Sequence, residues 1–161
     1  MADHWQKQIR DALKTKLTVP PLLSLVAANV FIEDEYPRES GKFPGVNIAF
    51  ADTQRRRIGT VNLGAGVQGI EVENLAAIEV EIVVRQDTGC RDLLIQIAKE
   101  IEVRWLATPA DKYLGVQGCR DSELINIRQP NFDVDSDVLT ATQVVQFEVT
   151  VRSFEGRPDQ S

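Results

Sequence analysis

The sequence predicts an α+β protein in which a single mixed, largely antiparallel β-sheet carries two main α-helices on one face. Residues 70–85 and 139–154 alternate apolar and polar side chains, which is the period of a strand with one buried face. Residues 90–106 instead repeat apolar side chains at steps of three and four, which is the period of an amphipathic helix. The helix can therefore lie across the apolar face of both strands.

The strand at 70–85 and the helix at 90–106 form the centre of the predicted fold. The strand places apolar residues at even positions and charged residues at odd ones: Ile70, Val72, Ile78, Val80, Ile82 and Val84 against Glu71, Glu73, Glu79, Glu81 and Arg85. The apolar side of the helix is formed by Cys90, Leu94, Ile97, Ala98, Ile101 and Trp105. We expect Asp87 or Thr88 to cap its first turn by accepting a backbone N–H. Asp92 near its start and Arg104 near its end have the charges that the helix dipole favours.

The N-terminal part of the chain predicts one more helix and two more strands. The helix covers residues 3–17, and its apolar side consists of Trp5, Ile9, Ala12, Leu13 and Leu17. Two prolines at 20–21 end this helix, because proline has no N–H and restricts the residue before it. Strands at 29–34 and 46–51 flank a loop at 36–43, and we expect them to pair.

We interpret the whole chain, residues 1–161, as a single domain with a flexible excursion at residues 52–69. The excursion holds the run Arg55-Arg56-Arg57 and four glycines, with at most a short strand at 58–63. Residues 110–118 are expected to be irregular, residues 123–128 to form a short strand, and residues 130–137 to form an acidic turn. The polar C-terminal tail, residues 155–161, is expected to fray.

Composition limits the classes of function. The formal net charge of -6 argues against a sequence-independent grip on nucleic acid, which needs clustered Lys and Arg. Two cysteines cannot form a disulfide framework, and their spacing fits no metal-ligand pair, so we expect an intracellular site of synthesis. The most apolar early stretch, residues 19–32, is too short to span a membrane and contains two prolines. We therefore expect no targeting segment and no membrane association.

Two motifs resemble ligand sites as strings of letters. Residues 64–69, Gly-Ala-Gly-Val-Gln-Gly, match a dinucleotide fingerprint, but that fingerprint must open a helix, and here an alternating strand follows. Asp133, Asp135 and Asp137 have the first spacings of a calcium loop. Position six of that loop would be Val138 rather than Gly, and position twelve Val144 rather than Glu. A glycine-rich loop and a solvated acidic turn explain both motifs better.

The residues that could act as nucleophile or base do not form an arrangement typical of catalysis. His4 is the one histidine, and we interpret it as a surface residue at the start of the first helix. Cys90 falls on the apolar side of the central helix, and Cys119 is interpreted as a thiol on a loop. We therefore expect no enzymatic activity, no cofactor and no metal.

Arg55, Arg56 and Arg57 are the one local basic cluster and the candidate interface residues. A run of charges is usually a solvated surface. The alternative interpretation is a contact with an acidic partner, or with DNA passing close by. The sequence leaves both interpretations open.

The order of elements resembles that of the tail terminator, or tail completion, proteins of long-tailed bacteriophages. The resemblance covers nearly the whole chain and consists of patterns of residue class. It includes Ile9-Arg10 and Leu13 in the first helix, the run Phe43-Pro44-Gly45-Val46-Asn47-Ile48, and Ile82-Val83-Val84 followed by Asp92-Leu93-Leu94 and Ile101-Glu102. It ends with Val145-Gln146-Phe147-Glu148-Val149 before a polar C-terminus. The excursion at residues 52–69 is longer than in the simplest members of that family.

The resemblance implies a non-enzymatic virion protein of the tail or neck that is made in the host cytoplasm. Such a protein assembles as a homohexameric ring, caps the tail tube and presents a surface to the head–tail connector protein, with DNA passing close by in the lumen. Two alternatives remain open. One is another neck or tail ring component of a phage or contractile injection system, and the other is an α+β domain that binds a small molecule.

Overall fold

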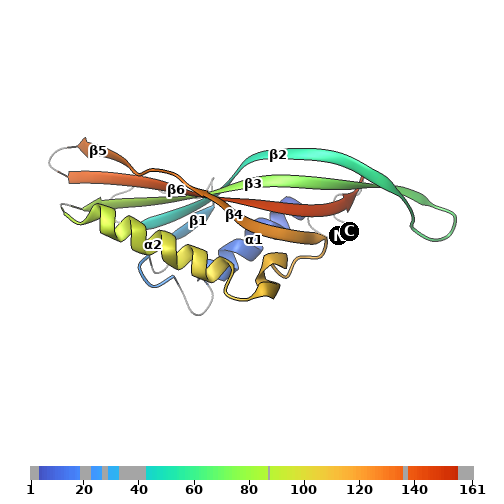
Figure 1. Ribbon diagram of the computed structural model, residues 1–161, viewed down its shortest axis with the longest axis horizontal. Helices are drawn as coiled ribbons and strands as arrows, with labels where there is room; N and C mark the ends of the chain where they lie inside the picture. Colours follow the sequence, from blue (N-terminus) through green and yellow to red (C-terminus); the bar gives the residue numbers. More distant parts are fainter. Residues whose placement is uncertain are drawn as a thin grey trace.

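A long twisted sheet lies against two α-helices, which cover the same face of it in the computed structural model (Figure 1). The structure describes residues 4–18, 23–26, 29–32, 43–86, 88–135 and 138–155. The elements follow in the order α1 (Trp5–Thr18), β1 (Val30–Ile32), β2 (Gly45–Asn62), β3 (Gln68–Gln86), α2 (Cys90–Trp105), the 3-10 helix η2 (Pro109–Tyr113), β4 (Cys119–Ile127), β5 (Asn131–Asp135) and β6 (Val138–Phe154).

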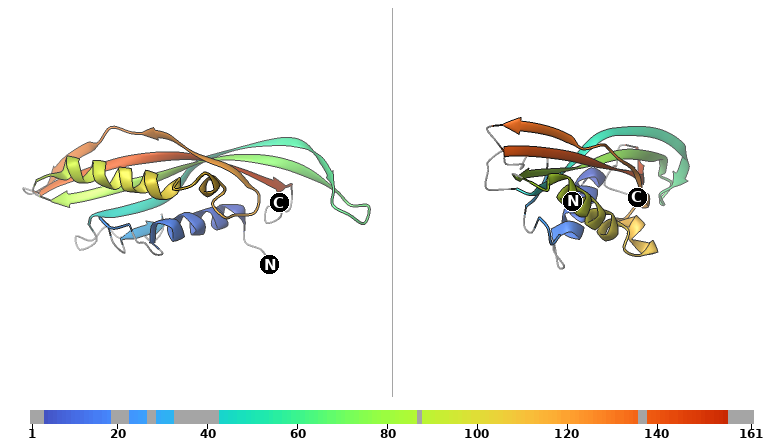
Figure 2. Two further views of the ribbon diagram at one scale, coloured as in Figure 1. Left: turned by 60° about the horizontal axis from the view of Figure 1, so that its bottom comes forward. Right: turned by 60° about the vertical axis from the view of Figure 1, so that its left-hand side comes forward.

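The six strands form one mixed sheet in which five follow the order β1-β2-β3-β6-β4. Strand β5 pairs with the first residues of β6, and β4 pairs with later residues of the same strand. Only the β1–β2 pair is parallel, and the other pairs are antiparallel. Both helices lie on one side of the sheet in each of the further views (Figure 2). The predicted fold class is therefore confirmed.

Strands β3 and β6 form the centre of the sheet and have the predicted alternation. Even positions of β3 are buried from Val72 to Val84, whereas Ile70 is only half-buried. Odd positions of β6 are buried from Ala141 to Ser153. The register pairs Ile78 with Phe147, so the buried faces of the two strands lie on the same side. The two long strands predicted from the sequence are confirmed.

Helix α2 packs on that face through the predicted side chains. The buried residues of the helix are Cys90, Leu94, Ile97, Ala98, Ile101 and Trp105, the same six that its period indicated. The Trp105 ring is stacked on Phe147, with 3.5 Å between ring centroids and 2° between planes. The indole N–H of Trp105 donates to the Ser122 hydroxyl at 3.2 Å, which satisfies the polar atom of a buried ring.

The predicted side-chain cap of α2 is wrong for Thr88. The N-cap is Gly89, with φ of 74° and no side-chain hydrogen bond to the first turn. The chain must take a left-handed conformation here, which glycine adopts without a Cβ penalty, so the turn is fixed by the backbone. The Thr88 carbonyl accepts a hydrogen bond from the Gln86 amide instead, at 2.6 Å. Asp87 lies outside the described residues.

Helix α1 covers the β1–β2 side of the sheet and has the predicted apolar side. Its buried residues are Trp5, Ile9, Leu13 and Leu17. Trp5 packs edge-on against Phe50 of β2, with 6.2 Å between ring centroids. The strand predicted at 29–34 is present as β1, and residues 33–34 lie outside the described ranges. Its expected pairing with the strand at 46–51 is confirmed, in parallel orientation.

Three predictions for the C-terminal half need correction. Residues 110–118 are not wholly irregular, because Thr108 and Asp111 form a capping box that starts η2. The strand expected at 123–128 is longer and begins at Cys119. Residues 131–135 form the strand β5 rather than part of a turn, because they pair with β6 up to Asp135 and Val138. The C-terminal tail after Glu155 lies outside the described residues.

Candidate assembly surfaces

Residues 52–69 form a regular antiparallel hairpin, so the expectation of at most a short strand at 58–63 within this excursion is wrong. Strand β2 continues to Asn62 and pairs with β3 down to Gln68, with register shifts after Phe50 and after Arg57. Figure 1 shows the two strands extending past the helices at one end of the molecule. Pairing of β3 with β6 starts only at Glu71. Residues 59–70 are therefore a two-stranded projection, which we call the hairpin tip.

The glycines of residues 64–69 serve the turn of this hairpin. Gly64, Ala65 and Gly66 have positive φ angles of 93°, 50° and 76°. The Leu63 N–H donates to the Val67 carbonyl at 2.8 Å and closes the turn. The segment leads into strand β3 and opens no helix, so the structure lacks the helix N-terminus on which a dinucleotide fingerprint depends.

The two faces of the hairpin tip differ in chemistry. Val61 is opposite Gly69 in the register, and Leu63 is bonded opposite Val67, so these residues share the face turned away from the helices. A Cβ placed on Gly69 would lie 2.7 Å from the Leu63 Cδ1 atom, so Leu63 already fills the space over this glycine. The pairs on the other face are Thr60 with Ile70 and Asn62 with Gln68. The outer face of the tip is therefore apolar, and the inner face is mainly polar.

The three candidate arginines lie on β2 just before the tip and are exposed. Arg56 forms an ion pair with Glu73 of β3 at 2.8 Å, and Arg57 forms one with Glu155 at 2.7 Å. The hydrogen bond from Arg57 lowers the pKa of the Glu155 carboxyl and raises that of the Arg57 guanidinium. The cluster is thus on a strand rather than on a loop, and two of its charges have partners within the chain.

Arg152 of β6 extends the Arg56–Glu73 pair across the outer face of the sheet. It lies 3.6 Å from Glu73 and 3.7 Å from Glu71. Charged side chains and bulges on an edge strand also prevent unwanted pairing with other sheets. The outer edge of β2 past β1 has both, so edge protection is a structural explanation for the arginine run that requires no partner.

The opposite end of the molecule holds the acidic segment of β5. Asp133 is exposed there, whereas the Asp135 side chain and Asp137 lie outside what the structure describes. Phe132 is 38% exposed and Val134 70% exposed, and Arg91 of α2 lies over the Phe132 ring at 5.5 Å from its centroid. Within the described residues, no three His, Cys, Asp or Glu side chains gather in a way that could hold a metal ion.

The remaining candidate residues are not brought together. His4 is exposed at the start of α1, where its Nδ1 accepts the Gln6 N–H at 3.2 Å. Cys90, the first residue of α2, is buried on the apolar side of the helix as predicted. Cys119 is not a loop thiol: it is buried at the start of β4, and its Sγ lies 3.6 Å from the Lys112 carbonyl oxygen. Burial raises the pKa of the Cys119 thiol to about 11.

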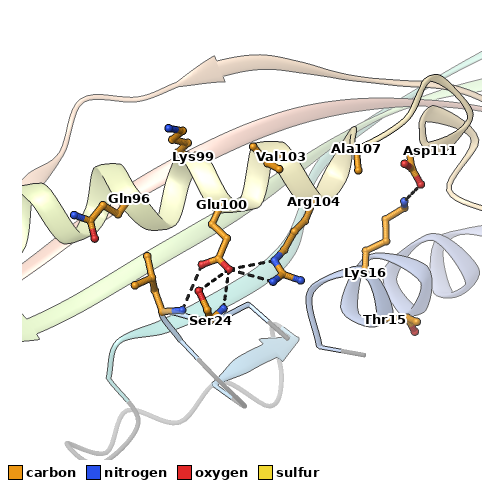
Figure 3. A pocket seen from close by; sticks show the side chains of 11 residues that line it. Thr15, Lys16, Ser24, Gln96, Lys99, Glu100, Val103, Arg104, Ala107 and Asp111 are labelled. Atoms are coloured by element: carbon orange, nitrogen blue, oxygen red, sulfur yellow. Dashed lines mark hydrogen bonds and ion pairs between the residues drawn. The ribbon is translucent and has the colours of Figure 1, made fainter. Parts of the chain in front are cut away.

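A groove between the two helices was not visible from the sequence. It has a volume of about 880 Å³, and its lining includes Lys16 of α1, Ser24, and Glu100 and Arg104 of α2 (Figure 3). Glu100 accepts hydrogen bonds from the Ser24 hydroxyl and backbone and from Arg104. Burial by itself raises the pKa of Glu100, but these bonds outweigh it and lower the pKa.

Four of the charged groups that line the groove form two ion pairs, Arg104 with Glu100 and Lys16 with Asp111. Lys16 forms an ion pair with Asp111, and the hydrogen bonds from Lys16 and then Thr108 lower the pKa of the Asp111 carboxyl. Sequence periodicity could not reveal the groove, because its walls come from segments far apart in the chain. Among the described helices, none is both long and apolar enough to cross a membrane.

Comparison with known proteins identifies the fold. No protein-family model matches the sequence, and no characterised protein matches it by sequence. The structure is similar to a chain from the structure described as "Virion of native gene transfer agent (GTA) particle". The similarity has a TM-score of 0.51 at 11% sequence identity and covers 89% of this chain and 94% of that chain. This chain therefore has the fold of a chain found in a gene transfer agent virion particle.

Proposed function

We propose that this chain is a structural protein of a phage-like virion. The observation that carries the proposal is the fold shared with a chain of a gene transfer agent virion particle over nearly the full length of both chains. The exposed two-stranded projection adds support, because it exposes apolar side chains that an assembly partner could cover. In this role the protein works by the surfaces that it presents rather than by chemistry at a pocket.

Within the virion we propose the role of tail terminator. Six copies form a ring that caps the completed tail tube, stops its growth and joins it to the head–tail connector protein. A ring suits one repeated heterologous contact, which closes at a defined rotation. The net charge of -6 suits a ring through which DNA passes, because an acidic subunit does not bind phosphates tightly. The protein is made in the host cytoplasm and ends in the neck of the particle.

Deletion of the gene tests this role in a producing host. Without a terminator, tail tubes are expected to grow past their normal length, and electron microscopy of negatively stained lysates measures that length directly. Tails of normal length beside unattached heads would instead indicate another neck or tail ring component. Particles of normal form and infectivity would contradict a virion role. Complementation with the wild-type gene is the control for loss of neighbouring genes.

The arginine cluster supplies a test of the assembly surface. We expect replacement of Arg55, Arg56 and Arg57 by Ser to leave the fold intact and to slow ring formation or tube capping, most clearly at low salt. A double variant, Glu73→Gln with Glu155→Gln, is the matched control, because it keeps the arginines and removes their internal partners. We expect this double variant to assemble faster than the wild type. Light scattering across ionic strength measures the assembly of the wild type and of both variants. Indistinguishable assembly curves would make the cluster a solvated part of the sheet.

Binding of a small molecule is the second candidate function, and the groove between α1 and α2 is what favours it. Its volume of about 880 Å³ is within the range of ligand sites. Its acidic groups, however, already have partners in Ser24, Arg104 and Lys16. A thermal-shift screen of small molecules against wild type and Val103→Glu, which changes a lining residue 58% exposed, tests this function. Ligands that stabilise only the wild type would support it.

A further inference from the structure

The apolar face of the hairpin tip is open to solvent. Val61 is 37% exposed and Val67 44% exposed, although both extend the face on which Leu63 packs over Gly69. A two-stranded hairpin without further support is only marginally stable in water. A cover on this face would therefore stabilise the tip. The inner face is mainly polar, with Ile70 the one apolar residue of its two pairs.

A second exposed apolar surface lies at the other end of the molecule. It consists of Phe132 and Val134 of β5 with Ile95 of α2, and we call it the β5 patch. Ile95 is 54% exposed and follows Arg91, which covers the Phe132 ring, by one helical turn. Phe132 pairs with Ala141 and Val134 with Leu139, so both strand residues lie on the helix side of the sheet. The β5 patch is thus a short apolar surface beside the start of α2.

The two surfaces also differ in charge. Residues 53–70 contain three arginines and no acidic residue, whereas strand β5 contains two aspartates and no basic residue, with Arg91 of α2 over its Phe132 ring. Figure 1 shows the hairpin tip and β5 at opposite ends of the long axis. A chain therefore cannot bring its own tip to its own β5 patch, but successive copies can bring these ends together.

We propose that the hairpin tip of one copy packs its apolar face on the β5 patch of the next copy. The contact is heterologous, so its repetition gives a closed ring or an open filament. Apolar burial supplies the affinity, and the arginines beside the tip and the aspartates beside the patch set the orientation and the rate of encounter. This inference rests on the proposed ring and names the surfaces that build it.

Adjacent residues on opposite faces of the tip give a matched pair of variants. Val67→Glu places a carboxylate on the apolar face, and Gln68→Glu places the same group on the polar face one residue later. Sedimentation velocity across protein concentration measures assembly. We expect Val67→Glu to raise the concentration needed for assembly by about tenfold or more, because it buries an unpaired charge. Gln68→Glu should stay within about twofold of the wild type, the level of a surface change.

A mixing experiment identifies the partner surface. Val134→Glu damages the β5 patch and leaves the tip intact, so this variant and Val67→Glu should each be monomeric by themselves. Mixed in equal amounts, they should form a one-to-one dimer that does not grow, because only one intact tip and one intact patch meet. The control is Val67→Glu alone at the total protein concentration of the mixture. A mixture that stays monomeric would overturn the proposed pairing of surfaces.

The failures of the two proposals can be told apart. If the wild type forms rings and Val67→Glu forms them equally well, the tip contact is wrong and the ring stands. If the wild type stays monomeric both alone and with tail tubes, the proposed ring and the proposed tip contact are both wrong. Far-UV circular dichroism and the thermal midpoint check folding. We expect Val67→Glu and Val134→Glu to match the wild type in both measurements, because Val67 and Val134 lie outside the buried core.

Discussion

Replacing Ile101 with alanine tests how α2 is attached to the sheet. Ile101 is fully buried on the sheet side of the helix. The change removes three carbon atoms, and burial of each contributes about 0.8 kcal/mol, or about 2.4 kcal/mol together. The cavity left behind adds to this, so we expect a loss of about 2–5 kcal/mol in the free energy of unfolding. The better helix propensity of alanine offsets only a few tenths, on the order of 0.4 kcal/mol.

Val103→Ala is the matched control, two residues further along the same helix. Val103 is 58% exposed, so its loss should change stability by no more than about 0.5 kcal/mol. Urea unfolding followed by circular dichroism measures both variants, at a protein concentration low enough that assembly adds nothing to stability. Equal effects of the two changes, or a loss below about 0.5 kcal/mol for Ile101→Ala, would refute the packing of this face of α2.

Three further outcomes are expected. Ser122→Ala should cost about 1–3 kcal/mol in urea unfolding, because it leaves the buried indole N–H of Trp105 without its acceptor, and no loss would show that water replaces the hydroxyl. Since the folded-state pKa of Glu100 is lowered, its stabilisation is present above the unfolded pKa of about 4.3 and is lost as pH falls through the folded value. The stability gap between wild type and Glu100→Gln should therefore shrink on acidification, and a gap that widens would contradict the hydrogen bonds to Ser24 and Arg104. Cys119, with a pKa of about 11, should resist a thiol reagent at pH 8 until urea unfolds the protein, and rapid labelling of the native protein would show that it is accessible.

The core could be predicted because its elements each bury one face. The six side chains that attach α2 to the sheet are those that the three- and four-residue steps indicated. The same holds for Val145, Phe147, Val149 and Val151 of β6. Burial of one face requires apolar residues at a regular period, so the period in the sequence predicts which face is buried.

The hairpin at residues 52–69 could not be predicted by this route. Most of its side chains are exposed on both faces, so nothing imposes alternation on the sequence. Its strand conformation follows from the register already set where Val46 pairs with Ile82 and Ile48 with Val80. Once those residues are aligned, the backbones beyond them lie side by side and continue to pair. That information is spread over two segments of the chain, and a scan of one segment cannot recover it.

The predicted side-chain cap of α2 is wrong for a different reason. Asp, Ser and Thr are common at N-caps, so Thr88 was a reasonable expectation. The structure instead needs a positive φ at Gly89, and the first-turn N–H of Leu93 bonds to the Gly89 carbonyl at 3.1 Å. Backbone handedness thus decided the cap, and the adjacent glycine was the signal that could have shown it.

The pairing of the arginines changes what holds the proposed contact together. A free cationic cluster would have to supply much of the attraction, and assembly would then weaken steeply with salt. Arg56 and Arg57 already bind Glu73 and Glu155 across the sheet, so a partner must compete with carboxylates in place. The apolar face of the tip has no such competitor. Affinity therefore resides mainly in Val61 and Val67, and charge acts mainly on the encounter of two copies.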